Sequence, residues 1–265
     1  MLEIPIHNYG FFSCCSVTIY HIIQYFNTHK KLPLMIDNNN NYMLYNIHPG
    51  IDISSYFFKI NNDDIQHIQD IYIDIDNNQY ANYNTVRYNE IIPFVEKYFS
   101  PSTNINNIYS HLIKKYNIDA NNCIGLYYRG TDKYTETTLG SFELFYNKLI
   151  SILEPNITVL IQTDSYSFLN YMIDKDIKNV IIINENKCSY SNNGIHNEST
   201  TLQNFNEIQY LFATFLIISK CKYVICSSGN CSIWMMYYRI MYYRMMYYQG
   251  NLNNVYQCLG GLFIQ

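Results

Sequence analysis

The 265-residue chain carries little charge and no excess of positive charge. Charged residues make up 14% of it, and 17 Lys and Arg against 21 Asp and Glu give a formal net charge of −4. A chain with this balance has no overall electrostatic attraction to nucleic acid or to an acidic membrane surface. We therefore predict no nucleic-acid partner, and any binding site for an anion must be local.

The eight cysteines include no C-x-x-C pair. The five-residue steps among Cys221, Cys226 and Cys231 do not match the ligand spacing of a zinc site. We predict reduced core thiols, because several cysteines lie inside apolar runs, where free Cys behaves as a small hydrophobe. We predict no metal site either, since the D-x-D sequence at 74–76 lacks further oxygen ligands nearby.

The chain also lacks a long hydrophobic run. No stretch of about 18 apolar residues is free of charge, so we expect no membrane span. The first ten residues, MLEIPIHNYG, have neither the basic nor the apolar region of a signal peptide. We therefore expect a soluble, cytoplasmic protein.

Tyrosine, asparagine and isoleucine are abundant, and there are 29 Tyr. AT-rich codons explain much of this bias, so we interpret the run Asn38–Asn41 as a surface loop. Residues 236–250 repeat a pentad, MYYRI, MYYRM, MYYQG, whose period fits neither a helix nor a heptad. Our hypothesis is that one or two copies are insertions near a helix end, whose deletion leaves folding intact.

The second half alternates short apolar runs with longer amphipathic stretches. This rhythm predicts strands at 123–128, 157–162, 179–184 and 222–226, with helices at 141–153, 165–174, 203–220 and from about Cys231. Asp164 or Ser165 is expected to cap the second helix, and Thr201 or Asn204 the third. We predict an α/β domain at 120–265 with a doubly wound parallel sheet.

The first half gives weaker signals. Its pattern predicts a turn at 7–15 and then a helix at 16–27, which Ser13 or Ser16 would cap. It also predicts strands at 51–60 and 71–75 and helices at 89–99 and 105–116. We interpret residues 1–119 as a smaller α/β domain, with the boundary in the polar stretch 118–122.

Polar residues follow each predicted strand of the second half. In an open parallel sheet, ligands bind outside the carboxyl ends of the strands. The polar groups at these ends are Arg129 to Lys133, Gln162 to Asp164, the loop with His196 and Asn197, and Ser227 to Asn230. Small residues at a helix start let backbone N–H groups approach phosphate, while Arg129 adds a bidentate fork and Lys133 a point charge. The sequence therefore predicts a pyrophosphate site.

These motifs carry a resemblance to a known family. The segment 125–239 resembles the fucosyltransferase superfamily of GT-B fold, which includes α1,6-, α1,2- and protein O-fucosyltransferases. Residues 127–133, YYRGTDK, are similar to its motif His-Val-Arg-Arg-Thr-Asp-Lys. Matching in order are the strand end Thr163-Asp164, the loop SYSNNGIHN at 189–197, the turn 227–230 and, as in the α1,2 branch, CSIW at 231–234.

The resemblance implies two Rossmann-like domains and an inverting glycosyltransferase. Such an enzyme moves a sugar from a nucleotide-sugar donor to a glycan or protein hydroxyl, without an obligatory metal or other cofactor. By the resemblance, Arg129 neutralises the donor phosphates, Lys133 is a second phosphate contact, and Asp132 orients the loop. Glu136 is the candidate base, although it stands three residues after Lys133 and the α1,6 branch has its Glu four residues after.

Other positions of the resemblance complete the expected donor site. They are Thr163, Asp164, His196, Ser227, Ser228, Gly229 and Asn230, together with Gly10 and Phe11 in place of the family's Gly-rich first loop. The motif His and second Arg are replaced by Tyr127 and Gly130, and Thr214 stands where the α1,6 branch has an acidic residue that reads guanine. The resemblance therefore implies GDP-fucose or another nucleotide sugar as the donor.

Each of these residues also has a structural interpretation. Arg129, Asp132 and Lys133 could form a solvated salt-bridge cluster, and Glu136 and His196 could be surface residues. The turn 227–230 could be a helix cap. A functional alternative is a catalytically degenerate relative that binds a nucleotide or a glycan without transferring a sugar.

Overall fold

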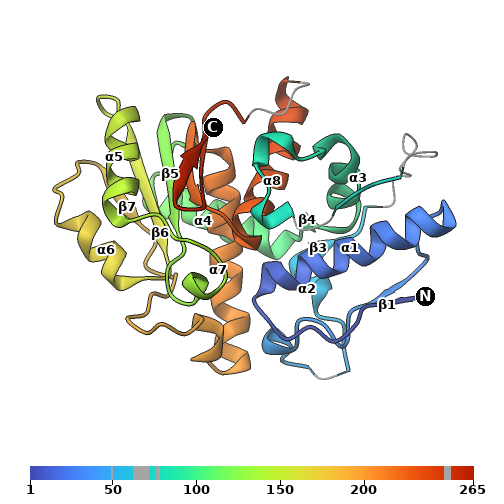
Figure 1. The fold of residues 1–265 in the computed structure, drawn as a ribbon. Coiled ribbons are helices and arrows are strands. Elements are labelled where there is room, and N and C mark those ends of the chain that lie inside the picture. The colour runs from blue at the N-terminus through green and yellow to red at the C-terminus, as the bar shows by residue number, and fades with distance from the viewer. Residues whose placement is uncertain (49, 62–71, 76–77, 248–251) are drawn as a thin grey trace.

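The structure is a computed structural model that describes residues 1–48, 50–61, 72–75, 78–247 and 252–265 (Figure 1). Its centre is a six-stranded sheet of order β10-β9-β8-β5-β6-β7, in which only the β9–β10 pair is antiparallel. The strands are β5 (Cys123–Tyr128), β6 (Thr158–Thr163), β7 (Val180–Ile182), β8 (Tyr223–Ser227), β9 (Val255–Leu259) and β10 (Leu262–Ile264). The four predicted strands are confirmed, and β9 and β10 were not predicted.

Helices cover both faces of the sheet (Figure 1). Ile124, Leu126 and Tyr128 of β5 pack with α5 (Phe142–Ile152) and α6 (Tyr166–Ile173). Cys123 and Tyr127 face α7 (Thr201–Lys220) and α8 (Asn230–Tyr247). Since both faces are buried, β5 is a continuous apolar run rather than an alternating one. Ser165 caps α6 as expected, whereas α7 is capped by Thr200 through a capping box with Gln203.

The first half contains α1 (Phe11–His29), α2 (Ser54–Phe57), α3 (Tyr88–Tyr98) and α4 (Thr103–Tyr116). Its described strands, β1 (Leu2–Glu3), β2 (Ile36–Asp37), β3 (Phe58–Lys59) and β4 (Ser100–Pro101), have two residues each. The described residues of 1–119 therefore form no Rossmann-like sheet, and that expectation is wrong for them. The helices at 89–99 and 105–116 are confirmed.

Three local predictions for the first half need correction. The first helix begins at Phe11 directly after Gly10, so neither Ser13 nor Ser16 caps it. Within the predicted strand at 51–60, only β3 is extended, and the four residues before it form α2. The Asp52 carboxylate accepts a hydrogen bond from the Ser54 N–H at 2.8 Å and starts this helical turn. Residues 72–75 form no strand, and residue 71 and Asp76 of the D-x-D sequence lie outside the described residues.

The two halves share one aromatic core. Phe11 and Phe12 of α1 pack with Phe212 of α7, with ring centroids 6.3 and 5.6 Å apart. Phe99 lies 4.8 Å from Trp234 of α8, also between ring centroids. The first half therefore covers the face of α7 and α8 that the sheet leaves free, and the boundary at 119/120 stays a prediction.

The pentad repeat continues α8 as far as Tyr247, and residues 248–251 lie outside the described part. Its first copy is buried, and the Arg239 guanidinium donates to the carbonyl oxygens of Ser219 and Cys221 at 3.0 and 2.7 Å. Because Arg239 satisfies carbonyls at the end of α7, this copy is part of the core, and the hypothesis that one or two copies are insertions stays a prediction.

Buried polar and sulfur groups complete the picture. All eight cysteines are free, and six of them are buried, as predicted for core thiols. The Asn38–Asn41 run is not a plain surface loop, because Asn38 and Asn41 are buried and Asn41 donates to the Cys14 carbonyl and the Thr18 hydroxyl. Among the described residues, no helix is long and apolar enough to span a membrane.

Candidate active site

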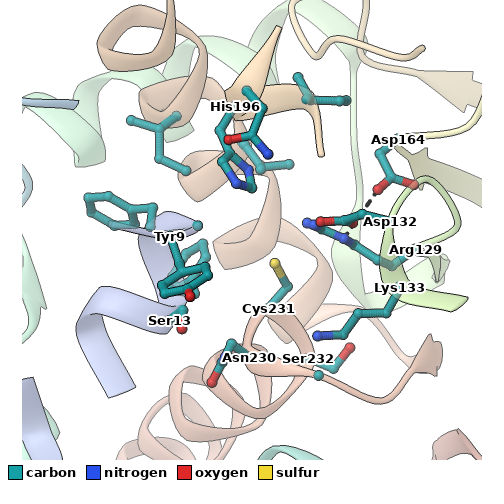
Figure 2. A pocket seen from close by; sticks show the side chains of 18 of the residues that line it. Tyr9, Ser13, Arg129, Asp132, Lys133, Asp164, His196, Asn230, Cys231 and Ser232 are labelled. Atoms are coloured by element: carbon teal, nitrogen blue, oxygen red, sulfur yellow. Dashed lines mark hydrogen bonds and ion pairs between the residues drawn. The ribbon is translucent and has the colours of Figure 1, made fainter. Parts of the chain in front are cut away.

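A cavity of about 610 Å³ lies between the start of α1 and the carboxyl ends of β5, β6 and β8. Figure 2 shows Arg129, Asp132 and Lys133 on one side, opposite Tyr9 and Ser13 of the first half. The structure brings eleven of the predicted site residues to this cavity: Gly10, Phe11, Arg129, Asp132, Lys133, Glu136, Asp164, His196, Ser228, Gly229 and Asn230.

Arg129 follows β5 directly and is held by two carboxylates. Its Nη2 lies 2.7 Å from Oδ1 of Asp132, and its Nε lies 3.2 Å from Oδ2 of Asp164. Burial alone would lower the pKa of Arg129, but the negative groups around it, Asp164 foremost and Asp132 among them, together outweigh burial and hold the pKa well above its ordinary value. The side chain keeps 21% of its surface exposed, so a fixed, permanently charged guanidinium reaches the cavity.

Asp164 also fixes the loop that carries Arg129. Its carboxylate accepts hydrogen bonds from the Gly130 N–H and the Thr131 hydroxyl, both at 2.8 Å. A Cβ at position 130 would lie 2.4 Å from Cε1 of Tyr128. Tyr128 cannot give way easily, because its ring stacks on Phe168 with centroids 4.2 Å apart. The second motif Arg of the resembled family would therefore not fit this loop.

Lys133 is nearly buried beside the turn that precedes α8. A Cβ at Gly229 would lie 3.1 Å from Cε of Lys133, and Gly229 has φ +148°, which favours glycine. The Lys133 ammonium lies 2.5 Å from Oε2 of Glu136 and 5.3 Å from the centroid of the Tyr80 ring. The Lys133 side chain is thus enclosed by neighbouring residues, and its ammonium is paired with the Glu136 carboxylate.

Glu136, the predicted base, is 46% exposed. Its Oε2 also accepts a hydrogen bond from the Tyr80 hydroxyl at 2.5 Å. Burial acts to raise the pKa of Glu136, but the hydrogen bonds from Lys133 and Tyr80 outweigh it and lower that pKa. Both contacts use Oε2, so the carboxylate is charged and held from one side.

His196 lies in a short 3₁₀ helix, η6 (Ile195–Asn197), and lines the cavity near Gly10. A Cβ at Gly10 would lie 3.8 Å from Cε1 of His196. Burial and then the Arg129 charge lower the pKa of His196. A neutral imidazole therefore faces the cavity at neutral pH. Phe11 is part of the cavity wall, but its ring is buried in the aromatic core and does not project into the cavity.

The turn 227–230 is largely bonded to protein groups. Ser227 Oγ accepts from the Arg129 N–H at 3.2 Å, and Ser228 Oγ donates to the Cys258 carbonyl at 2.8 Å. Asn230 Oδ1 accepts from the Ser16 hydroxyl at 2.7 Å. These side chains shape the turn, so the groups it can offer an anion are the first backbone N–H groups of α8.

Three predicted donor residues do not line the cavity. Ser227 is buried behind Arg129, and Thr163 Oγ1 accepts from the Ser165 N–H at 3.1 Å. Thr214 is fully buried, donating to the Tyr210 carbonyl and accepting from Asn186 Nδ2 at 2.8 and 2.9 Å. The structure assigns these hydroxyls local structural contacts.

Several cavity residues were not predicted. Glu207 of α7 lines the cavity, and burial raises its pKa. It lies two helical turns before Thr214 on the same face, so helical periodicity could have indicated it. His7 Nε2 lies 2.8 Å from the Ser13 hydroxyl, within hydrogen-bond distance, and Cys231 lies between the two walls (Figure 2). These last residues have no local sequence signal.

The charges around the predicted anion site do not favour an anion by themselves. The ion pairs join two cations, Arg129 and Lys133, to three carboxylates, Asp132, Asp164 and Glu136, which leaves one negative charge in excess. Binding of an anion here would therefore require that it replace a carboxylate, or that it gain from the partial positive charge at the start of the 18-residue helix α8.

A comparison with protein-family models finds no match. A comparison with curated proteins finds none either. Three solved structures are similar to this chain, each at 12% sequence identity. NodZ alpha-1,6-fucosyltransferase co-crystallized with GDP has a TM-score of 0.36, and the match covers 53% of this chain and 42% of that one; for NodZ alpha-1,6-fucosyltransferase soaked with GDP-fucose the TM-score is 0.37 and the coverages are 53% and 44%. For fucosyltransferase NodZ from Bradyrhizobium the TM-score is 0.31 and the coverages are 48% and 38%.

The chain thus spans less than half the length of these structures. With 12% identity and TM-scores of 0.31 to 0.37, these likenesses concern part of the fold.

Proposed function

We propose that the cavity binds the diphosphate of a nucleotide-sugar donor and transfers its sugar, with inversion, to a hydroxyl of a glycan or protein. The observation that carries the proposal is the convergence of Arg129 and Lys133 on the start of α8, where Gly229 leaves room for the Lys133 side chain. A guanidinium, an ammonium and a helix N-terminus form a combination suited to a diphosphate.

The proposed reaction breaks the bond between the anomeric carbon and the diphosphate oxygen. The electron pair leaves with the diphosphate, where Arg129 and Lys133 stabilise the developing charge. The acceptor hydroxyl attacks the opposite face of the carbon and loses its proton to Glu136, the candidate base. The proposal assigns all these roles to protein groups and therefore invokes no metal or other cofactor.

A site built from both halves of the chain fits this proposal. The cavity walls come from both halves of the chain, with the cations from 120–265 and His7, Tyr9 and Ser13 from 1–119. We assign the donor to the first wall and the acceptor to the second. A fucosyl or related deoxysugar donor follows from the motif resemblance at 127–133.

A second candidate function is binding of a nucleotide or glycan without transfer. It is favoured by the lowered pKa of Glu136, which makes this carboxylate a weaker base. The excess of one negative charge around Arg129 and Lys133 points the same way.

Release of nucleoside diphosphate from a panel of sugar nucleotides distinguishes the two functions. The transfer proposal predicts slow hydrolysis of at least one donor by the wild type. It predicts a rate lower by about 100-fold or more in Arg129→Ala, the scale of losing one charge-stabilising group. Glu136→Gln should lower the rate and still bind the donor.

Binding of a donor without any release, in the presence or absence of acceptor glycans, would contradict transfer and support the binding function. Arg87→Ala is the matched control, because Arg87 pairs with Glu90 on the surface and is 54% exposed.

A further inference from the structure

In the contact between Lys133 and Glu136, the lysine side chain is enclosed by the protein and the glutamate side chain is exposed to solvent. The Lys133 side chain is only 9% exposed and lies against Gly229, whereas the Glu136 side chain is 46% exposed. Moving Lys133 away would require repacking of the turn before α8. Glu136 can turn into solvent, where an exposed carboxylate is well hydrated.

We propose that Glu136 is an internal competitor that a donor diphosphate must displace from Lys133. The inference rests on the proposed function of the cavity and adds how the donor gains access to its ammonium. A diphosphate beside Lys133 brings more than one negative charge close to the Glu136 carboxylate, and like charges at such distances repel strongly. Since Lys133 is enclosed and Glu136 is not, the carboxylate is the group that leaves.

Tyr80 is the positioning residue for this competitor. Its hydroxyl donates to Oε2 of Glu136 at 2.5 Å, the same oxygen that Lys133 contacts. Tyr80 ends a short 3₁₀ helix, η2 (Asn78–Tyr80), so the group that holds Glu136 comes from the first half of the chain. Tyr80 therefore keeps the carboxylate on the ammonium.

The segment that carries Tyr80 is anchored to the second half. The Tyr83 N–H donates to Oε1 of Gln257 at 2.9 Å, and Nε2 of Gln257 donates to the Ala81 carbonyl at 2.8 Å. The Gly229 N–H donates to the Tyr83 hydroxyl at 3.2 Å. The positions of Tyr80 and Gly229 are thus coupled through Tyr83, so Lys133 and its competitor are held by one bonded group of residues.

Calorimetric titration with GDP and with inorganic pyrophosphate, both in EDTA, tests the proposal. Removing the competing charge in Glu136→Gln should tighten the binding of both ligands, on the order of tenfold. Tyr80→Phe should tighten it by a smaller factor. The double variant should bind no more tightly than Glu136→Gln, because Tyr80 acts through Glu136.

The chain offers a matched control pair. Glu154 accepts from the Lys222 ammonium at 2.8 Å and from the Tyr223 hydroxyl at 2.7 Å, which reproduces the same three groups away from the cavity. Glu154→Gln and Tyr223→Phe should leave both affinities unchanged.

The outcomes separate the two levels of the proposal. Equal or weaker binding by Glu136→Gln, with the wild type binding GDP, would overturn the competitor role and leave the donor site intact. Absence of binding by both proteins would overturn the donor site itself. Binding by Glu136→Gln alone would support the competitor role in its strongest form.

Discussion

Arg129 and His196 illustrate how single residues acquire their properties from neighbours far along the chain. Arg129 remains charged although it is largely enclosed, because Asp132 and Asp164 contact it from two segments. Burial lowers the pKa of His196, and the positive charge of Arg129 lowers it further. The cavity is therefore lined by a guanidinium that keeps its proton, Arg129, and by an imidazole that loses its proton more easily than usual, His196.

His196 should make the fold less stable in mildly acidic solution. Its pKa is lower in the folded chain than in the unfolded chain, where it is about 6.5. The neutral His196 therefore costs the fold no stability above a pH of about 6.5. As the pH falls below about 6.5, the free energy of unfolding decreases by about 1.4 kcal/mol per pH unit, until the pH reaches the pKa of His196 in the folded chain. Urea unfolding of the wild type and His196→Gln at pH 5 to 8 measures this.

The pKa values of His7 and His21 are lowered as well, so the difference between the two proteins isolates His196. The variant should gain stability relative to the wild type as the pH falls. A difference that stays constant over this range would contradict the assignment.

At the scale of elements, α7 and α8 connect the sheet to the first half. The end of α7 depends on α8, because Arg239 donates to the carbonyls of Ser219 and Cys221. Gly125 of β5 lets α7 approach, since a Cβ there would lie 2.7 Å from Cγ2 of Ile218. Small changes at these contacts should disturb the strands that present Arg129.

Arg239→Met should destabilise the protein by about 3 kcal/mol or more, because it leaves buried carbonyls without their charged donors. Chemical denaturation measures the change, and Arg87→Met on the surface should alter stability by less than about 0.5 kcal/mol. An Arg239→Met protein as stable as the wild type would show that this contact is dispensable.

The elements differ in how well the sequence predicts them. The strand β5 is readable because all six of its residues are buried and apolar or small. The strand β9 is short and has Gln257 at its centre, whose buried amide serves Tyr83 and Ala81. The aromatic residues of segment 51–60 pack against α7, and this long-range contact leaves no sign in the local sequence pattern.

The same distinction holds for the candidate site. Arg129, Asp132 and Lys133 follow a strand end, so their position is a consequence of the predicted sheet. Tyr80 contacts Glu136 from 56 residues away, and His7 reaches the cavity from the N-terminal segment. Such partners are determined by how the two halves pack, which composition and spacing do not encode.

At the scale of the whole molecule, the cavity depends on both halves at once. The aromatic core joins α1 to α7 and α8, and the cavity lies beside this junction. Occupation of the cavity by a ligand should therefore stabilise the entire chain, since a ligand that binds only the folded state shifts unfolding by mass action.

The central claim is that the cavity binds a nucleoside diphosphate through Arg129, and thermal unfolding with GDP and UDP tests it most directly. We expect one or both nucleotides to raise the Tm of the wild type and of Arg87→Ala. We expect Arg129→Ala to bind at least roughly 30-fold more weakly, the effect of about 2 kcal/mol. A wild type whose Tm neither nucleotide changes, or an Arg129→Ala protein stabilised equally, would contradict the account.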